Sequence, residues 1–263
     1  MRIIVLMKQV LNSEQVAFHR DDDTGTYTLI RNPMDSIMNY DDGNALEMAL
    51  RWKDQNPETH ITVLSMGPPG AEDMLRECLA IGVDQAILIT DERISGADTV
   101  ATATYLASSI NKIGEYDLIL AGYQSQDGRT GQIGPMVAEK LGIPQITYVR
   151  TFYEEAGRLI GIRELGEMDE KTAIEMPCVV VISKQKYCLR GMTLSAIRKA
   201  LKKEICIWNL EDICGKAAIC LSRTATIEIE QVEKKRKNKI VKFEDCQNGI
   251  LADIIREVQK LGC

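Results

Sequence analysis

The stretch YDLILAGYQSQDGRTGQIGP, from Tyr116 to Pro135, carries the strongest structural signal in the sequence. Asp117 to Ala121 is a short, mostly apolar run typical of a buried strand in a parallel sheet, and Gly122 ends it. Glycines, hydroxyls, an amide and Asp127 follow, before a segment from Gln132 to Leu141 that predicts a helix. A strand, a glycine-rich turn and a helix start in succession can present backbone N–H groups to a phosphate. The stretch therefore suggests a nucleotide site, with an ordinary strand-to-helix loop as the alternative.

Similar units precede this stretch. The expected strands are Ile3–Met7, His60–Ser65 and Gln85–Thr90, and the expected helices are Asn39–Asp54, Glu72–Ile81 and Val100–Ile110. Asp41 or Asp42 is expected to cap the helix that begins near Asn39. Together these units predict an α/β fold with a doubly wound, mostly parallel, Rossmann-like sheet, whose carboxyl edge binds ligands.

The pattern changes after Pro144. Expected antiparallel strands with charged turns cover Thr147–Phe152, Arg158–Leu165 and Lys171–Glu175, and a buried strand covers Cys178–Ser183. A basic helix (Ser195–Lys203), a charged connector (Gln231–Lys242) and an amphipathic terminal helix (Asn248–Leu261) follow. We expect an α/β nucleotide-binding domain with an added antiparallel hairpin layer over residues 1–207, and a C-terminal extension over residues 208–263.

Composition excludes several classes of protein. A net charge of -6 and a pI near 5.2 argue against a nucleic-acid partner, since phosphate neutralisation needs clustered Lys and Arg. The loop after the first strand, Lys8–Ser13, contains no glycine, which argues against an ATP-cleaving protein with a phosphate loop there. The 8 cysteines have no metal or redox spacing, so neither a metal site nor a catalytic residue is predicted. The apolar N-terminal run is too short for a signal peptide, which predicts a cytoplasmic protein.

With these segments in place, nearly the whole chain resembles the beta subunit of an electron transfer flavoprotein. The resemblance is carried by IMNYDDGNALEMAL (Ile37–Leu50), MGPPGAEDMLRECLAIGVDQA (Met66–Ala86), SGADT (Ser95–Thr99), the Tyr116–Pro135 stretch and MTLSAIRKALKK (Met192–Lys203). It implies a fold like that of the adenine nucleotide alpha hydrolases. It also implies a heterodimer, in which an alpha subunit carries FAD and the beta subunit holds AMP or a second FAD.

The resemblance also implies a set of pocket residues. Carried over to this sequence they are Leu6, Asn39, Tyr40, Asp41, Asp42, Met66, Gly67, Gly122, Tyr123, Gln124, Asp127, Gly128, Arg129, Thr130, Gly131, Gln132 and Ile133. The N–H groups around Gly131 and Gln132 and the Thr130 hydroxyl are suited to phosphate. Asp98 or Asp127 can accept from ribose hydroxyls or can orient its loop, and Thr99 adds a hydroxyl beside Asp98.

Two departures from the family pattern affect this pocket. Tyr123 replaces the arginine of the usual Gly-Arg-Gln turn, and Arg129 replaces the second aspartate of Asp-Gly-Asp-Thr. We expect Arg129 to contact the pyrophosphate in place of the missing arginine. The Met66–Pro69 wall favours FAD over AMP, since it suits a flavin ring.

Three functions stay open. In the first, FAD in the beta site accepts hydride from NADH and bifurcates the electrons, one of them toward a low-potential carrier such as ferredoxin; MGPPGAE and SGADT resemble bifurcating members. In the second, the chain holds structural AMP in a shuttle that serves an acyl-CoA dehydrogenase-like or other redox enzyme. The third is a stand-alone adenine-nucleotide-binding protein. Met192 and Leu194, framed by basic residues, are the expected contacts to the redox partner, with burial of Leu194 in the core as the alternative.

Overall fold

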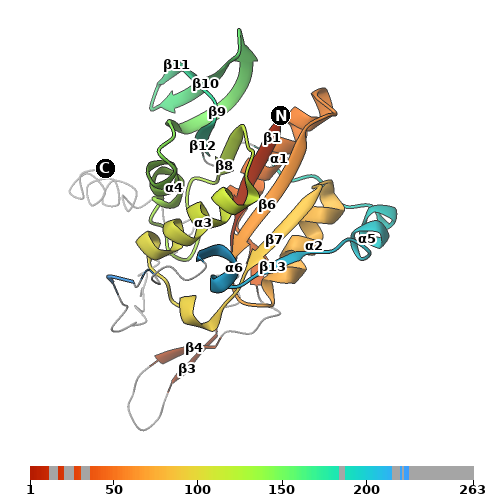
Figure 1. Cartoon of the computed structure of the whole chain (residues 1–263), viewed down its shortest axis with the longest axis vertical. Coiled ribbons are helices and arrows are strands. Elements are labelled where there is room, and N and C mark those ends of the chain that lie inside the picture. The colour runs from red at the N-terminus through yellow and green to blue at the C-terminus, as the bar shows by residue number, and fades with distance from the viewer. Residues whose placement is uncertain are drawn as a thin grey trace, which may run out of the picture. The chain divides into compact units, whose positions relative to one another are not determined.

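The computed structural model describes residues 1–11, 17–20, 27–30, 36–183, 187–214, 220 and 222–224 (Figure 1). The chain divides into two units, Met1–Glu228 and Ile229–Cys263, and every described residue lies in the first. The predicted connector Gln231–Lys242 and the predicted terminal helix Asn248–Leu261 therefore lie outside the described residues.

One large sheet forms the centre of the first unit. Its strands are β1 (Arg2–Met7), β6 (His60–Met66), β7 (Gln85–Ile89), β8 (Leu118–Ala121), β9 (Gln145–Glu155), β10 (Arg158–Leu165), β11 (Met168–Ile174), β12 (Cys178–Ile182) and β13 (Cys206–Trp208). They lie in the order β11-β10-β9-β12-β8-β1-β6-β7-β13. From β9 to β13 neighbouring strands pair in parallel, while β10 and β11 add an antiparallel hairpin layer next to β9. The predicted mostly parallel α/β sheet is confirmed.

Helices cover both faces of this sheet (Figure 1). They are α1 (Tyr40–Gln55), α2 (Ala71–Ile81), α3 (Thr99–Ile113), α4 (Ile133–Leu141), α5 (Leu194–Ala200) and α6 (Leu210–Cys214). Side chains of α1, α2 and α5 belong to one buried apolar cluster, and those of α3, α4 and α6 belong to the other. Among the described residues, no helix is long and apolar enough to cross a membrane.

Alternation along β1 explains why it lies in the middle. Ile3, Val5 and Met7 belong to the α1 and α2 cluster, and Ile4 and Leu6 to the α3 and α4 cluster. Both faces of the strand are therefore apolar, as a parallel strand between two helix layers requires. Each such side chain stabilises the fold by about 1.5–3 kcal/mol through burial.

The order of connections places a ligand site at the carboxyl ends of β1 and β8. From β1 the chain proceeds to β6 and β7 on one side of the sheet, then returns to β8 and β12 on the other side. A sheet that reverses direction in this way binds ligands outside the carboxyl ends of the strands where the reversal occurs. The strand pairs at this point are β1 with β8 and β1 with β6.

Smaller elements extend the first unit. Beyond the main sheet, β2 (Gln9–Leu11) pairs with β5 (Ser36–Met38), and β3 (Ala17–Arg20) pairs with β4 (Tyr27–Ile30), both antiparallel. Later in the chain, Trp208 of β13 pairs with Ile89 of β7, and Leu210 of α6 is buried. The sheet thus continues just past residue 207, where the extension was expected to begin.

Candidate functional site

Lys8, the first residue after β1, connects three segments at the carboxyl edge of the sheet. Its backbone N–H donates to Asp42 Oδ2 at 2.9 Å, and its carbonyl accepts from the Asn39 N–H at 2.9 Å. Its Nζ lies 2.7 Å from Asp127 Oδ1 in the loop after β8. The start of α1 and the loop after β8 are therefore held against the end of the central strand.

Asn39 occupies the N-cap position of α1, where Asp41 or Asp42 was expected. Its side chain makes no capping bond to the helix backbone but bonds to the loop after β8: Nδ2 donates to the Gln124 carbonyl at 2.9 Å, and Oδ1 accepts from the Gln126 N–H at 3.2 Å. The predicted capping role of the aspartates is wrong because Asn39 precedes the helix, whereas Asp41 and Asp42 lie inside its first turn. Asn39 is fully buried, so these bonds satisfy an amide that would otherwise be costly to bury.

Gly122, the residue after β8, packs tightly against Asp42 of α1. A Cβ atom at residue 122 would lie 2.3 Å from Asp42 Oδ1 and 2.5 Å from the carbonyl carbon of Asp41. Only glycine fits there. Burial raises the pKa of Asp42 to about 7, although hydrogen bonds from Asn39 and the Lys8 N–H favour its ionised form.

The loop from Gly122 to Gln132 turns sharply at its exposed end. Arg129 (φ 50) and Gly131 (φ 62) both adopt left-handed backbone conformations. Asp127 shapes this end: its Oδ1 accepts from the Gly128 N–H at 2.6 Å as well as from Lys8. Burial raises the pKa of Asp127 but the Lys8 ammonium lowers it, and the net effect is a pKa below the usual range. Of the two roles predicted for Asp127, orientation of the loop is the one that its contacts show.

Backbone donors of this loop suit an anion. Within the part of the chain that the structure describes, the N–H groups of Thr130, Gly131 and Gln132 donate to no protein acceptor. Gln132 is the N-cap residue of α4, so the positive end of the helix dipole adds to these donors. Arg129 is exposed, and its Nε donates to the Gln126 carbonyl at 3.1 Å. A phosphate at this position would meet both backbone donors and a guanidinium.

Loops from β6 and β7 reach the same edge. The Gly67 N–H donates to the Ile89 carbonyl at 3.0 Å, which fixes the start of the loop after β6 to the end of β7. Gln9 Nε2 donates to the Gly70 carbonyl at 3.2 Å, and Thr99 Oγ1 lies 3.4 Å from Gln132 Oε1. The structure therefore brings Gly67 and Thr99 to the same edge of the sheet as the loop after β8.

Asp98 has a different position from the one expected for a ribose contact. Its Oδ1 accepts from the Ala101 N–H at 2.9 Å as the N-cap of α3. Its Oδ2 accepts from the N–H groups of Arg223 and Thr224 at 2.7 and 3.1 Å. Both carboxylate oxygens thus hold chain segments together, and the contacts of Asp98 are structural ones.

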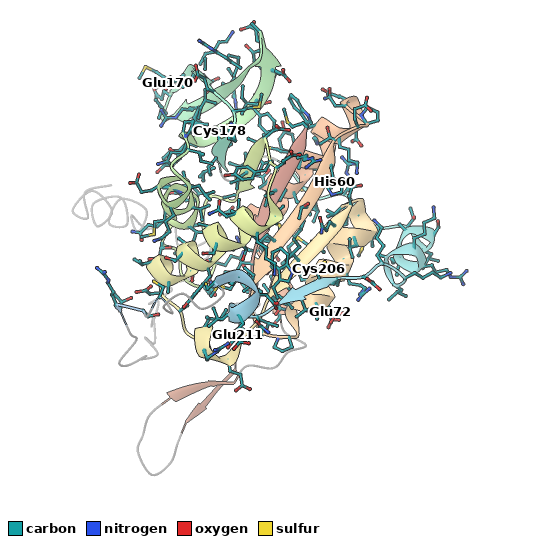
Figure 2. All side chains as sticks on the ribbon, in the orientation of Figure 1. His60, Glu72, Glu170, Cys178, Cys206 and Glu211 are labelled. Carbon is teal, nitrogen blue, oxygen red and sulfur yellow. The ribbon has the colours of Figure 1, made fainter. Side chains whose placement is uncertain are left out.

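The remaining predicted residues differ in exposure. Leu6 is buried in the apolar cluster under α3 and α4, so it supports the edge and does not line it. Met66 is partly buried against the same cluster, and Tyr40, the first residue of α1, is 64% exposed. The Tyr123 ring packs on Tyr148 with centroids 5.5 Å apart. Figure 2 labels His60 and Cys178, which mark the amino ends of β6 and β12, opposite the candidate site.

Met192 and Leu194, the expected partner contacts, belong to a later segment of the chain than the site loops, and both are exposed. Leu194 is the first residue of α5 and is 82% exposed, while Met192 is 41% exposed. The alternative that Leu194 is a core residue is wrong for this unit. Thr193 between them caps α5, since its Oγ1 accepts from the Ala196 N–H at 3.2 Å.

Lys8 is the site residue that sequence reasoning missed. The sequence places Lys8 in the loop after the first strand but predicts no role for it, because a lysine in a glycine-free loop matches no phosphate motif. Its place as the first residue beyond the central strand was the available signal, since ligands bind at that edge of a parallel sheet.

Comparison with known proteins adds to this geometry. The family model for the electron transfer flavoprotein domain matches residues 26–213. The caffeyl-CoA reductase-Etf complex subunit CarD of Acetobacterium woodii is 43% identical over 213 residues, which cover 81% of this chain and 80% of that protein. The electron transfer flavoprotein subunit beta of Megasphaera elsdenii is 39% identical over 266 residues, covering 98% and 97%. The acryloyl-CoA reductase electron transfer subunit gamma of Anaerotignum propionicum is 38% identical over 215 residues, covering 80% and 78%.

Proposed function

The chain belongs to the electron transfer flavoprotein family as a subunit of the beta type, and on this basis we propose that it holds FAD at the carboxyl ends of β1 and β8. In this proposal it pairs with an alpha subunit that carries a second FAD. The heterodimer moves electrons from NADH or a dehydrogenase to downstream acceptors in the cytoplasm.

The loop from Gly122 to Gln132 carries the proposal. The N–H groups of Thr130, Gly131 and Gln132, which bond to no acceptor among the described residues, lie at the start of α4, and Asp127, bound by Lys8, orients the turn. A cradle of this kind at the reversal point of a doubly wound sheet fits the phosphates of a nucleotide. The Thr130 hydroxyl and the Arg129 guanidinium would add side-chain donors to the backbone ones.

FAD is favoured over AMP by the number of donors and by the walls of the edge. AMP presents one phosphate, whereas Arg129 together with three N–H groups can serve a pyrophosphate. The exposed Pro68 and Pro69 beside Gly67 supply an apolar, rigid wall for a ring. When bound, a flavin supplies hydride and single-electron transfer, and the chain's own residues hold and orient it and exclude water.

The choice of FAD leads to a proposal of electron bifurcation, and the names of two relatives lead to a proposal for the partner. With FAD in the beta site, we propose that the chain accepts electrons from NADH and divides them between a low-potential carrier such as ferredoxin and the alpha-subunit FAD. Two relatives are named as parts of a caffeyl-CoA reductase complex and an acryloyl-CoA reductase. These names support a partner of the acyl-CoA dehydrogenase-like class, which the exposed Leu194 and Met192 would contact. The predicted packing of the C-terminal extension on the alpha subunit belongs to the same proposal.

The nucleotide content of the purified complex tests the choice of cofactor. The acid extract of the chain co-expressed with its alpha subunit should contain two FAD and no AMP per heterodimer. One FAD and one AMP would leave the shuttle function and refute bifurcation. Purification without an alpha subunit, with a nucleotide bound, would favour the stand-alone protein.

An arginine pair tests the site. Arg129→Ala should lower flavin occupancy of the beta site and abolish NADH oxidation while the alpha-subunit FAD stays bound. Arg158→Ala, which removes an exposed arginine of the β10 strand with an ion pair to Glu175, is the matched control and should change neither. Equal flavin content in both variants would contradict the proposed pyrophosphate contact.

A further inference from the structure

We propose that Arg190 and Arg76 are positioning residues for the docking tip, defined as Met192 to Leu194. Arg190 fixes the chain before the tip to α1, and Arg76 on α2 fixes the chain after it. The inference rests on the proposed function, in which the tip contacts the redox partner.

The docking tip needs support from outside itself. Leu194 is 82% exposed, and the helix that it begins, α5, has only 7 residues. Isolated helices of this length do not form stably in water. The tip can therefore keep one conformation only if flanking contacts fix it.

Arg190 makes the contact before the tip. Its Nε and its backbone N–H each lie 3.1 Å from Glu47 Oε2, and its Nη2 lies 3.1 Å from Glu47 Oε1. Its Nη1 and Nη2 also lie 3.1 and 2.8 Å from the two carboxylate oxygens of Asp54. Glu47 and Asp54 are seven residues apart on α1, two helical turns on one face. A guanidinium forked over two carboxylates holds its chain segment in orientation as well as in position.

Buried polar residues of α1 continue this attachment toward the strand. Asn44, 2% exposed, donates from Nδ2 to the Ser183 carbonyl at 2.8 Å and accepts at Oδ1 from the Tyr187 N–H at 3.0 Å. The Glu47 side chain is 4% exposed and is bound also by Arg51 at 3.0 Å. Polar groups this deeply buried are costly unless they are paired. Their partners all lie on α1 itself or on the segment that leads to the tip.

Arg76 makes the contact after the tip. Its Nη1 donates to the Ala200 carbonyl at 3.1 Å and to the Lys203 carbonyl at 2.8 Å, which satisfies carbonyl groups at the end of α5. Its Nη2 lies 2.6 Å from Glu72 on the same helix, α2, and Figure 2 labels that residue. Figure 1 shows α5 beside α2 at one side of the sheet. Ala200 is buried, so the end of α5 is packed as well as hydrogen-bonded.

A tip fixed at both ends loses little conformational entropy when a partner binds it. Preorganisation of this kind raises affinity without adding a contact to the partner. Removal of either arginine should therefore weaken encounter with the acceptor and leave the chemistry at the nucleotide unchanged.

Kinetics with the acceptor enzyme test this assignment in the complete heterodimer. Arg190→Met should lower kcat/KM for the acceptor about five- to tenfold through a higher KM, with the same kcat and the same rate of flavin reduction. The kcat/KM of Arg190→Lys should lie between those of the unchanged chain and Arg190→Met, since a lysine keeps the charge but cannot form paired bonds to two carboxylates. In a Leu194→Ala background Arg190→Met should have less than about a twofold effect, because it acts only through the tip.

Hydrogen exchange tests the same assignment without any acceptor. Arg190→Met and Arg76→Met should each speed amide exchange of residues 191–200 about tenfold. Arg163→Met, which breaks a similarly half-buried ion pair with Glu170 in the hairpin layer, is the control and should leave this segment unchanged. Asp54→Asn removes only an exposed partner of Arg190, so it gives a smaller effect in the same direction should Arg190→Met fail to fold.

Two results would overturn the inference. One is unchanged exchange in residues 191–200 of the arginine variants. The other is an Arg190→Met effect on kcat/KM that is the same size with and without Leu194. If Leu194→Ala itself leaves kcat/KM unaltered, the docking role in the proposed function fails, while the exchange data still decide whether the arginines position the tip.

Discussion

Replacement of Gly122 by alanine should separate the start of α1 from the end of β8. The added Cβ would lie 2.3 Å from Asp42 Oδ1, 2.5 Å from the Asp41 carbonyl carbon and 2.6 Å from the Asp42 backbone nitrogen. Two of these three atoms belong to the backbone, so no change of rotamer can relieve the overlap. The first turn of α1 has to move away from the strand.

The expected cost follows from this geometry. Overpacking of a filled core by single methylenes costs about 1–3 kcal/mol, and a clash with backbone belongs at the upper end. The movement also disturbs the buried bonds of Asp42 to Lys8 and of Asn39 to Gln124. We therefore expect a loss of about 2–4 kcal/mol in the free energy of unfolding, or a melting temperature lower by roughly 5–12 °C.

Gly70→Ala is the matched control for this prediction. A Cβ at residue 70 would meet nothing within 4 Å, and the backbone there is right-handed helical (φ -63, ψ -12). Alanine at such a position favours folding by about 0.4–1 kcal/mol through the unfolded state but is a poorer N-cap residue than glycine, so the net change in the free energy of unfolding should stay below about 1 kcal/mol. The purified Gly122→Ala protein should therefore melt at a lower temperature and contain less nucleotide than the purified Gly70→Ala protein. A Gly122→Ala protein that melts with the Gly70→Ala protein and keeps its nucleotide would refute the close-contact reasoning.

Three further predictions concern single side chains. The folded-state pKa of Asp42, about 7, lies above its ordinary 3.8, so ionisation of Asp42 costs stability as the pH rises through that window. The stability of Asp42→Asn relative to the unchanged chain should thus grow between pH 4 and pH 8 by on the order of 2–4 kcal/mol in urea unfolding. A flat difference would contradict burial of the charge. Lys8→Met should lower nucleotide occupancy measured by extraction while changing stability by no more than about 1 kcal/mol, because Lys8 and Asp127 are both nearly half exposed. Leu194→Ala should slow electron delivery to the acceptor at least about tenfold and leave the melting temperature unchanged. Leu201→Ala, which also removes an exposed leucine side chain, should change neither the rate nor the melting temperature. A lower melting temperature of the Leu194 variant would indicate a core role.

Much of the architecture could be predicted from local patterns. Apolar runs such as Cys178–Ile182 and helical periodicity such as that of Glu72–Ile81 placed most strands and helices within a few residues of where they lie. Parallel strands share one carboxyl edge, so the predicted parallel sheet already placed the loops after β1, β6, β7 and β8 on one side. The glycine-rich turn at residues 122–131 indicated the loop of the candidate site, and Gly131 does adopt the left-handed backbone that glycine permits.

Only the tertiary structure decided which polar groups meet. The bonds of Lys8 to Asp42 and Asp127 join residues 34 and 119 apart, and those of Arg190 to Glu47 join residues 143 apart. Local sequence carries no information about such pairs, because they depend on which strands become neighbours and on how close the helices pack. For the same reason the sequence could not decide whether Leu194 is a core or a surface residue, or whether Asp98 contacts a ribose or holds its own loop. The packing of α5 on α2 leaves Leu194 exposed, and the fold brings the N–H groups of Arg223 and Thr224 to the carboxylate of Asp98.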